Sequence, residues 1–126
     1  MKSTMMIKAW KVLRKDKNGR FLSSSIYEED GGVEYKESII TKPVENKGPL
    51  CAFTCRKSAE VFADLMSPNS YISECEVVKS EETVIWTNPL RKFSIQQLNN
   101  RYISNFVLCD SIKLLERPKL FIESEI

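Results

Sequence analysis

One group of residues in this sequence combines cations with aromatic rings. It consists of Arg91, Lys92, Phe93, Arg101 and Tyr102. Arginine can bind a phosphate through two parallel hydrogen bonds, and an aromatic ring can stack on a nucleobase. The group is therefore a candidate nucleotide site. A surface loop with two buried aromatic rings would have the same composition, and it remains the alternative.

A second candidate site lies at the start of a predicted helix over residues 55–66, with Thr54 as its expected N-cap. The backbone N–H groups of a first helical turn lack partners within the helix, so they can bind a phosphate or a carboxylate. Arg56 and Lys57 would stand beside these groups. Because cations in a first turn oppose the helix dipole, they are either tolerated at the surface or retained for a ligand.

The sequence has four cysteines, Cys51, Cys55, Cys75 and Cys109, and the first two are candidate nucleophiles. Cys55 would lie at the helix start, where the dipole and two adjacent cations lower the pKa of a thiol. A structural, partly buried thiol is the alternative. The spacing lacks the paired CxxC motifs of a structural zinc site, so we expect no metal and no other cofactor. Residues 1–8 lack the apolar core of a secretory signal, which favours a reducing cytoplasm and free thiols.

Paired carboxylates suggest a third kind of chemistry. Glu74 and Glu76 are two positions apart, which places both on one face of a strand. Together with Arg14 and the serines at 23–25, they loosely resemble the arginine, serine-rich strand and Glu-x-Glu elements of mono-ADP-ribosyltransferases. The alternative is a solvated strand face on which glutamates alternate.

Other catalytic classes are excluded by composition. The 126 residues include no histidine, which removes the Ser-His-Asp and Cys-His triads and the commonest general base. The four glycines match neither the GxGxxG motif nor the P-loop. A bound nucleotide would therefore have to be held by side chains and a helix terminus.

Charge is unevenly distributed along the chain, whose net charge is +2. Residues 1–20 contain seven basic residues and one acidic residue, hence +6, whereas residues 21–90 contain six and twelve, hence −6. Residues 91–126 carry +2. A basic N-terminal hairpin of this kind suits a small phosphate-bearing ligand better than an extended duplex. A charged edge hairpin that discourages aggregation is the alternative.

Hydrophobic periodicity predicts the elements that carry these residues. We expect strands over residues 7–14, 21–27, 33–40, 71–78 and 83–87, with one or two more within 105–115. Turns at Asn18-Gly19 and Asp30-Gly32 predict that the first three strands form a meander. Ala59, Phe62 and Ala63 give the helix an apolar stripe, and Ser94 could cap a second, short helix. The fold class is α+β: a single domain over 1–126 with a mostly antiparallel sheet of about six to seven strands and one or two helices.

Short motifs resemble those of small proteins encoded by bacteriophages and prophages. They are Gly48-Pro49-Leu50 before an apolar run, Ala59-x-x-Phe62-Ala63, Glu74 to Val77 and Val107 to Leu115. Some phage proteins of this size are counter-defence sponges for cyclic nucleotides or cyclic ADP-ribose, such as the anti-Thoeris proteins. Others are anti-CRISPR inhibitors that bind a protein. The resemblance implies a phage protein that acts in the cytoplasm of a bacterial host.

These features lead to one expected function and two alternatives. We expect a non-enzymatic, homo-oligomeric binding protein that sequesters a small phosphate-bearing nucleotide immune signal and so counters bacterial defence. The alternatives are an inhibitor that docks on a host defence complex through the basic hairpin of residues 8–20 or a sheet edge, and a minimal ADP-ribosyltransferase that uses Glu74 or Glu76. The sequence contains no run of about 18 apolar residues, so we expect no membrane span.

Overall fold

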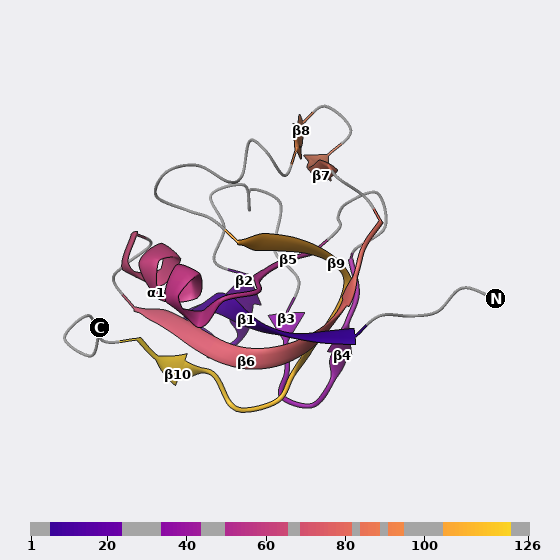
Figure 1. Cartoon of the computed structure of the whole chain (residues 1–126). Coiled ribbons are helices and arrows are strands. Elements are labelled where there is room, and N and C mark those ends of the chain that lie inside the picture. The colour runs from indigo at the N-terminus through magenta and orange to yellow at the C-terminus, as the bar shows by residue number, and fades with distance from the viewer. Residues whose placement is uncertain are drawn as a thin grey trace.

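The structure is a computed structural model, and it describes residues 6–23, 34–43, 50–65, 69–81, 84–88, 91–94 and 105–121. For residues 23, 84–88 and 91–94 it describes the backbone only. Within these ranges there are ten strands and one helix (Figure 1). The elements are β1 (Met6–Lys15), β2 (Phe21–Ser23), β3 (Glu34–Tyr35), β4 (Ile40–Thr41), β5 (Leu50–Phe53), α1 (Arg56–Leu65), β6 (Ser70–Lys79), β7 (Val84–Asn88), β8 (Arg91–Ser94), β9 (Phe106–Leu114) and β10 (Lys119–Leu120).

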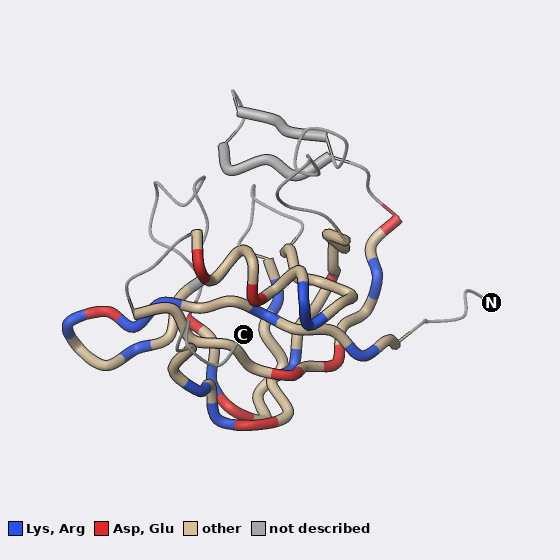
Figure 2. The backbone as a smooth tube through the Cα atoms, turned by 60° about the vertical axis from the view of Figure 1, so that its left-hand side comes forward, with Lys and Arg blue, Asp and Glu red and all other residues tan. Residues whose placement is uncertain are grey.

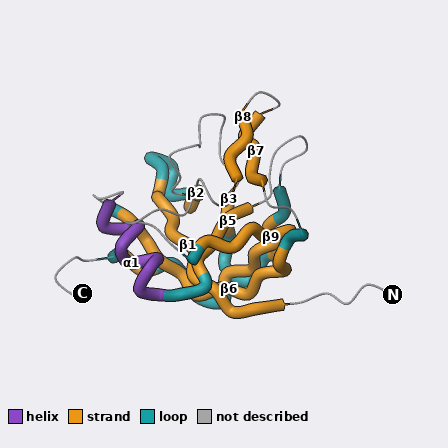
Figure 3. The backbone as a smooth tube through the Cα atoms, turned by 45° about the horizontal axis from the view of Figure 1, so that its top comes forward, coloured by secondary structure: helices purple, strands orange, loops and turns teal. Residues whose placement is uncertain are grey.

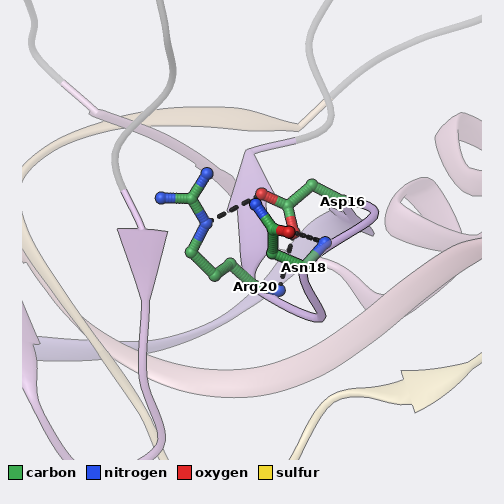
Figure 4. Close-up of polar contacts among 3 residues, drawn as sticks. All are labelled: Asp16, Asn18 and Arg20. Carbon is green, nitrogen blue, oxygen red and sulfur yellow. Dashed lines mark hydrogen bonds and ion pairs between the residues drawn. The ribbon is translucent and has the colours of Figure 1, made fainter.

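The N-terminal hairpin is closed by a turn that Asp16 organises. Its Oδ1 accepts hydrogen bonds from the backbone N–H groups of Asn18 and Arg20, each at 2.9 Å, and its Oδ2 accepts one from Arg20 Nε at 2.8 Å (Figure 4). Gly19 adopts a φ of 81°, which glycine takes without steric cost. β1 pairs antiparallel with β2, and β2 with β3, so the predicted three-stranded meander is confirmed.

Four strands close into a ring, which gives the molecule a small barrel core. β1 pairs with β6 from Met6 to Arg14, β6 pairs with β9, and β9 pairs with β5. β5 returns to β1 through the pair of Phe53 with Trp10, and every pairing in the ring is antiparallel. β2, β3, β4 and β10 extend this eight-stranded sheet, whereas β7 and β8 form a separate two-stranded sheet.

The interior of the ring is filled by alternate residues of its strands, because successive side chains of a strand point to opposite faces. Buried side chains from β1, β5, β6 and β9 pack there. They are Ala9, Leu13, Leu50, Ala52, Cys75, Val77, Val107, Cys109, Ile112 and Leu114. Tyr35 of β3 joins this cluster and is 1% exposed.

Helix α1 covers one end of the outer side of the ring. Ala59, Phe62 and Ala63 of its apolar stripe are buried against a second cluster that includes Phe53 and Ile72. The centroids of the Phe53 and Phe62 aromatic rings are 5.3 Å apart. The helix predicted from the 3.6-residue stripe is therefore confirmed over residues 56–65, while Met66 lies outside the described residues.

The α+β class is confirmed, but several boundaries differ from those predicted. The single strand expected over 33–40 is two short strands, β3 and β4, because the chain turns at Ser38, whose φ is 65°. Of the one or two strands expected within 105–115, the structure has one, β9. Ser94 ends β8, and the rest of the second predicted helix lies outside the described residues. Short strands such as β4 and β10 raise the main sheet to eight strands.

Candidate functional site

The first turn of α1 is capped by a cysteine. The carbonyl of Cys55 accepts the N–H of Ala59 at 3.2 Å, and the backbone N–H groups of Ser58 and Lys57 donate to the Cys55 sulfur. The prediction of Thr54 as N-cap is therefore wrong by one residue. The Thr54 hydroxyl instead donates to the carbonyl oxygen of Asn105 at 3.4 Å. The helix begins at Arg56, so both cations lie in its first turn, as predicted.

Arg56 and Lys57 are exposed at the first two helical positions, and the first turn contains no acidic residue. Arg56 Nε lies 3.7 Å from Glu60 Oε2, although the Arg56 side chain is 68% exposed. A pair this exposed and this long is weak in water. The guanidinium of Arg56 is thus available to an anion that approaches the helix start.

Asn105, which precedes β9, ties the start of α1 to the ring. Its carbonyl accepts the backbone N–H of Thr54 at 2.9 Å, and its Nδ2 donates to Ser58 Oγ at 2.8 Å. Its φ is 62°, a conformation in which asparagine is among the few tolerated residues. The sequence analysis did not select Asn105, and an asparagine directly before an apolar strand was the available signal.

The cysteines fall into two chemical environments. Hydrogen bonds from the backbone N–H groups of Ser58 and Lys57 to the sulfur hold the pKa of Cys55 below its ordinary value. Burial raises the pKa of Cys75 to about 12 and also raises the pKa of Cys109 well above its ordinary value. All four cysteines are free thiols. Cys55 is therefore the thiol at which thiolate forms most readily among these three.

The other predicted phosphate ligands are not placed beside α1. Arg91, Lys92 and Phe93 lie on β8, where Lys92 pairs with Trp86 of β7. Figures 1 and 3 both show this hairpin apart from α1. Arg101 and Tyr102 lie outside the described residues. The structure therefore separates the predicted phosphate ligands: Arg56 and Lys57 lie at the start of α1, and the other three described residues lie on β8.

Glu74 and Glu76 lie on the outer side of β6, since Cys75 between them points into the ring. Glu74 Oε1 lies 2.7 Å from Lys8 Nζ, and this hydrogen bond raises the pKa of the lysine. Glu74 pairs with Trp10 on β1, whereas Arg14 is four residues further along that strand. Four residues of a strand span about 13 Å, so the ring does not bring this arginine to the glutamates.

Four cations of the predicted basic hairpin lie at its tip. Arg14, Lys15, Lys17 and Arg20 are exposed around its turn, and Figure 2 shows this basic tip projecting from the sheet. Lys15 Nζ lies 5.5 Å from the centroid of the Phe21 ring, within range of a cation–π contact.

Lys11 is the exception among the hairpin cations, because it points into the ring. It is 5% exposed, its Nζ donates to the Cys51 carbonyl at 2.6 Å, and the same atom lies 5.4 Å from the Tyr35 ring centroid. One of the positive charges counted in residues 1–20 is therefore inside the protein and does not contribute a surface cation.

The part of the chain that the structure describes contains no cluster of three or more His, Cys, Asp or Glu residues able to hold a metal ion. No helix among the described residues is both long and apolar enough to cross a membrane. In comparisons with known proteins, no family model matches the chain, and neither a curated protein nor a solved structure matches it.

Proposed function

We propose that the protein is a non-enzymatic binding protein that sequesters a small phosphate-bearing nucleotide, with the start of α1 as the phosphate site. The observation that carries this proposal is the composition of the first helical turn. The backbone N–H groups of Lys57 and Ser58 donate to a sulfur atom, and two exposed cations stand beside them without an acidic residue in that turn.

This arrangement is unfavourable for an isolated helix. Ser, Thr, Asp and Asn are the preferred N-caps, and sulfur is a weaker hydrogen-bond acceptor than their side-chain oxygens. Cations at the positive end of the helix dipole cost further stability. A phosphate group would offset both costs, because its oxygens accept strongly from N–H groups and its charge complements the dipole.

Each residue of the site has a distinct role in the proposed complex. The N–H groups of Lys57 and Ser58 would donate to phosphate oxygens in place of the Cys55 sulfur, and the Arg56 guanidinium would bind the same phosphate with two hydrogen bonds. Asn105 would hold the turn in position through Thr54 and Ser58, so the donors would need little reordering on binding.

The rest of the described structure favours binding over turnover. The Cys75 and Cys109 thiols are buried and stay protonated, and Lys11 is enclosed in the ring. Glu74 is engaged by Lys8 on the outer face, away from Arg14. Among the described residues, these groups are therefore not brought together as an acid, a base and a nucleophile.

The ligand class that we propose is a cyclic nucleotide or a cyclic ADP-ribose, because the sequence resembles small phage proteins and some phage proteins of this size are sponges for such signals. Such a ligand presents one or two phosphates in a compact, preorganised form, which matches a site of a single helical turn. Electrostatic attraction would supply much of the affinity, so binding should weaken as the salt concentration rises.

Calorimetric titration and thermal shift with cyclic nucleotides and ADP-ribose derivatives test the proposal. We expect at least one compound to raise the melting temperature, and the Arg56→Ala/Lys57→Ala double variant to bind it at least tenfold more weakly. A change of this size is about 1.4 kcal/mol. Lys36→Ala is the matched control, because Lys36 is an exposed cation distant in sequence from the site.

Two results would contradict the proposal. One is that no compound stabilises the wild-type protein at concentrations well above a micromolar dissociation constant. The other is that the double variant and the control bind equally well, which would assign binding to another surface. Mass spectrometry of small molecules that copurify with the wild-type protein would identify the ligand directly.

A further inference from the structure

The basic tip of the N-terminal hairpin takes no part in the proposed nucleotide site. Residues 14–20 contain four basic residues and one acidic residue, hence +3, and all four cations are exposed. Arg14 pairs with Leu22 on β2, and Leu22 pairs in turn with Glu34 on β3, so a glutamate shares the cross-strand row of Arg14. The cations that the tip offers to a partner are the other three, Lys15, Lys17 and Arg20.

The turn holds Arg20 in an orientation that suits a phosphate. Both carboxylate oxygens of Asp16 accept hydrogen bonds within the turn, and the Asp16 side chain is only 13% exposed. Its Oδ2 accepts the Nε–H of Arg20 (Figure 4), so the two Nη groups of the guanidinium are left as donors for an anion. The Arg20 side chain is 53% exposed. A guanidinium held in this way can bind one phosphate through two parallel hydrogen bonds, with little further loss of side-chain freedom.

Two aromatic rings lie beside these cations. Phe21 follows Arg20 directly, and its ring contacts that of Tyr71 on β6 edge to face, with the centroids 5.2 Å apart. Lys15 Nζ lies 5.5 Å from the Phe21 centroid and 5.8 Å from the Tyr71 centroid. Both rings are half-buried, and Leu120, the β10 partner of Tyr71, is 46% exposed. The aromatic pair therefore reaches the surface beside the lysine.

This combination of cations and aromatic rings indicates a nucleic acid strand as the partner. Acidic side chains of a protein would match the cations but not the rings. A nucleobase can stack on an aromatic ring, and the phosphates that flank it can contact the cations. Bases in a duplex are already stacked on one another, so their faces are available only in a single strand. Three cations are also fewer than the roughly six to ten phosphate contacts of strong duplex binders.

We propose that the basic tip binds single-stranded nucleic acid. The three cations each contact one phosphate of the strand, and a base stacks against the pair of Phe21 and Tyr71. These contacts do not involve the proposed nucleotide site, whose cations, Arg56 and Lys57, lie on α1.

Fluorescence anisotropy of a labelled oligothymidylate of about 12 nucleotides tests the proposal with a matched pair of variants. Lys17→Ala/Arg20→Ala removes two cations of the tip, whereas Lys42→Ala/Lys79→Ala removes two exposed cations outside the hairpin. We expect the control to bind like wild type and the tip variant to bind at least tenfold more weakly at low salt. For three phosphate contacts, the logarithm of the association constant falls against the logarithm of salt concentration with a slope of about −2. The tip variant should reduce this slope to about −0.7.

A second pair of variants tests the aromatic contact. Tyr71→Phe keeps the ring, and Tyr71→Leu removes it while retaining an apolar side chain. We expect Tyr71→Phe to bind like wild type and Tyr71→Leu to bind at least fivefold more weakly, because a base stacks less well on an aliphatic side chain. Far-UV circular dichroism of each variant shows that it is folded, and the charge variants decide the proposal where Tyr71→Leu is not.

Four results would overturn the proposal. Wild type that does not bind the oligonucleotide at low salt is one, and a tip variant that binds it like the control is another. A duplex of the same length that binds as tightly would assign the tip to stacked DNA, and polyglutamate that binds as tightly would assign it to an acidic protein.

The same oligonucleotide separates this proposal from the proposed function. Arg56→Ala/Lys57→Ala should bind the oligonucleotide like wild type, and a loss of binding by this variant would place the strand at α1 instead. A wild type that binds the oligonucleotide but no cyclic nucleotide would contradict the proposed function alone. A wild type that binds a cyclic nucleotide but not the oligonucleotide would contradict the present proposal alone.

Discussion

At the scale of single residues, burial determines the chemistry of the cysteines. Cys75 is 0% exposed and its pKa is raised to about 12, because a thiolate inside the ring would lose its hydration. In the unfolded chain the same thiol ionises near its ordinary value of 9. The folded protein therefore holds this proton at a pH where the unfolded chain has released it, and its stability falls as the pH rises above about 9.

The Cys75→Ala variant isolates this effect. Between pH 8 and pH 10, wild type should lose about 1.4 kcal/mol of unfolding free energy through this thiol, a loss that the variant cannot show. Urea unfolding of both proteins at the two pH values measures it, and the other titrating groups cancel in the comparison. The difference in unfolding free energy between wild type and the variant should therefore be smaller at pH 10 than at pH 8. A penalty that is equal at both values would show that the thiol ionises inside the ring.

At the scale of elements, the start of α1 depends on one distant residue, Asn105, which directly precedes β9. Asn105 donates to Ser58 Oγ and holds a φ of 62°, so Asn105→Ala removes a hydrogen bond and places alanine in a disfavoured conformation. We expect a loss of about 2 kcal/mol in the free energy of unfolding, measured with urea. Asn105→Gly also removes the side chain but accepts the positive φ, so it should lose about half as much. Equal losses would show that the backbone conformation contributes nothing.

Local sequence patterns predicted those elements whose structure depends mainly on their own residues and not on contacts with distant segments. The apolar stripe of Ala59, Phe62 and Ala63 predicted α1, and alternation predicted β6 to within one residue at each end. The turn at Ser38 was not predicted, because serine rarely adopts a positive φ and no glycine marks the position. Closure of the ring was not predictable either, since the pair of Trp10 with Phe53 joins distant segments.

The candidate site was predictable to the same extent. Arg56 and Lys57 were identified because their unusual place in a first helical turn is visible in sequence. The brace from Asn105 was missed, since it acts across 47 residues of chain. The burial of Lys11 did leave a sequence signal, because Lys11 shares a strand face with Ala9 and Leu13, both of which are buried.

At the scale of the whole molecule, the ring and the β7–β8 hairpin are separate sheets. The residues before the hairpin segment are bonded within the ring to the residues after it. Lys79 pairs with Cys109, and the N–H of Ser80 donates to the Leu108 carbonyl at 2.8 Å. The two ends of that segment are therefore held close together by the ring itself. An isolated two-stranded sheet is only marginally stable, and no strand pairing joins the described hairpin to the ring, so we expect the hairpin to contribute little to the stability of the ring.

Replacement of residues 83–103 by a short Gly/Ser linker tests this division and, with it, the choice between the two predicted phosphate sites. Because the ring already holds the ends of the segment together, the shortened protein should fold with a melting temperature within a few degrees of wild type. It retains Arg56 and Lys57 but lacks Arg91, Lys92 and Phe93. If the start of α1 is the phosphate site, the shortened protein binds the nucleotide with less than a threefold loss of affinity, and the Arg56→Ala/Lys57→Ala substitutions weaken it as in the full chain. A folded, shortened protein that no longer binds would instead assign the ligand to the removed segment, because only there could the missing contacts have been made.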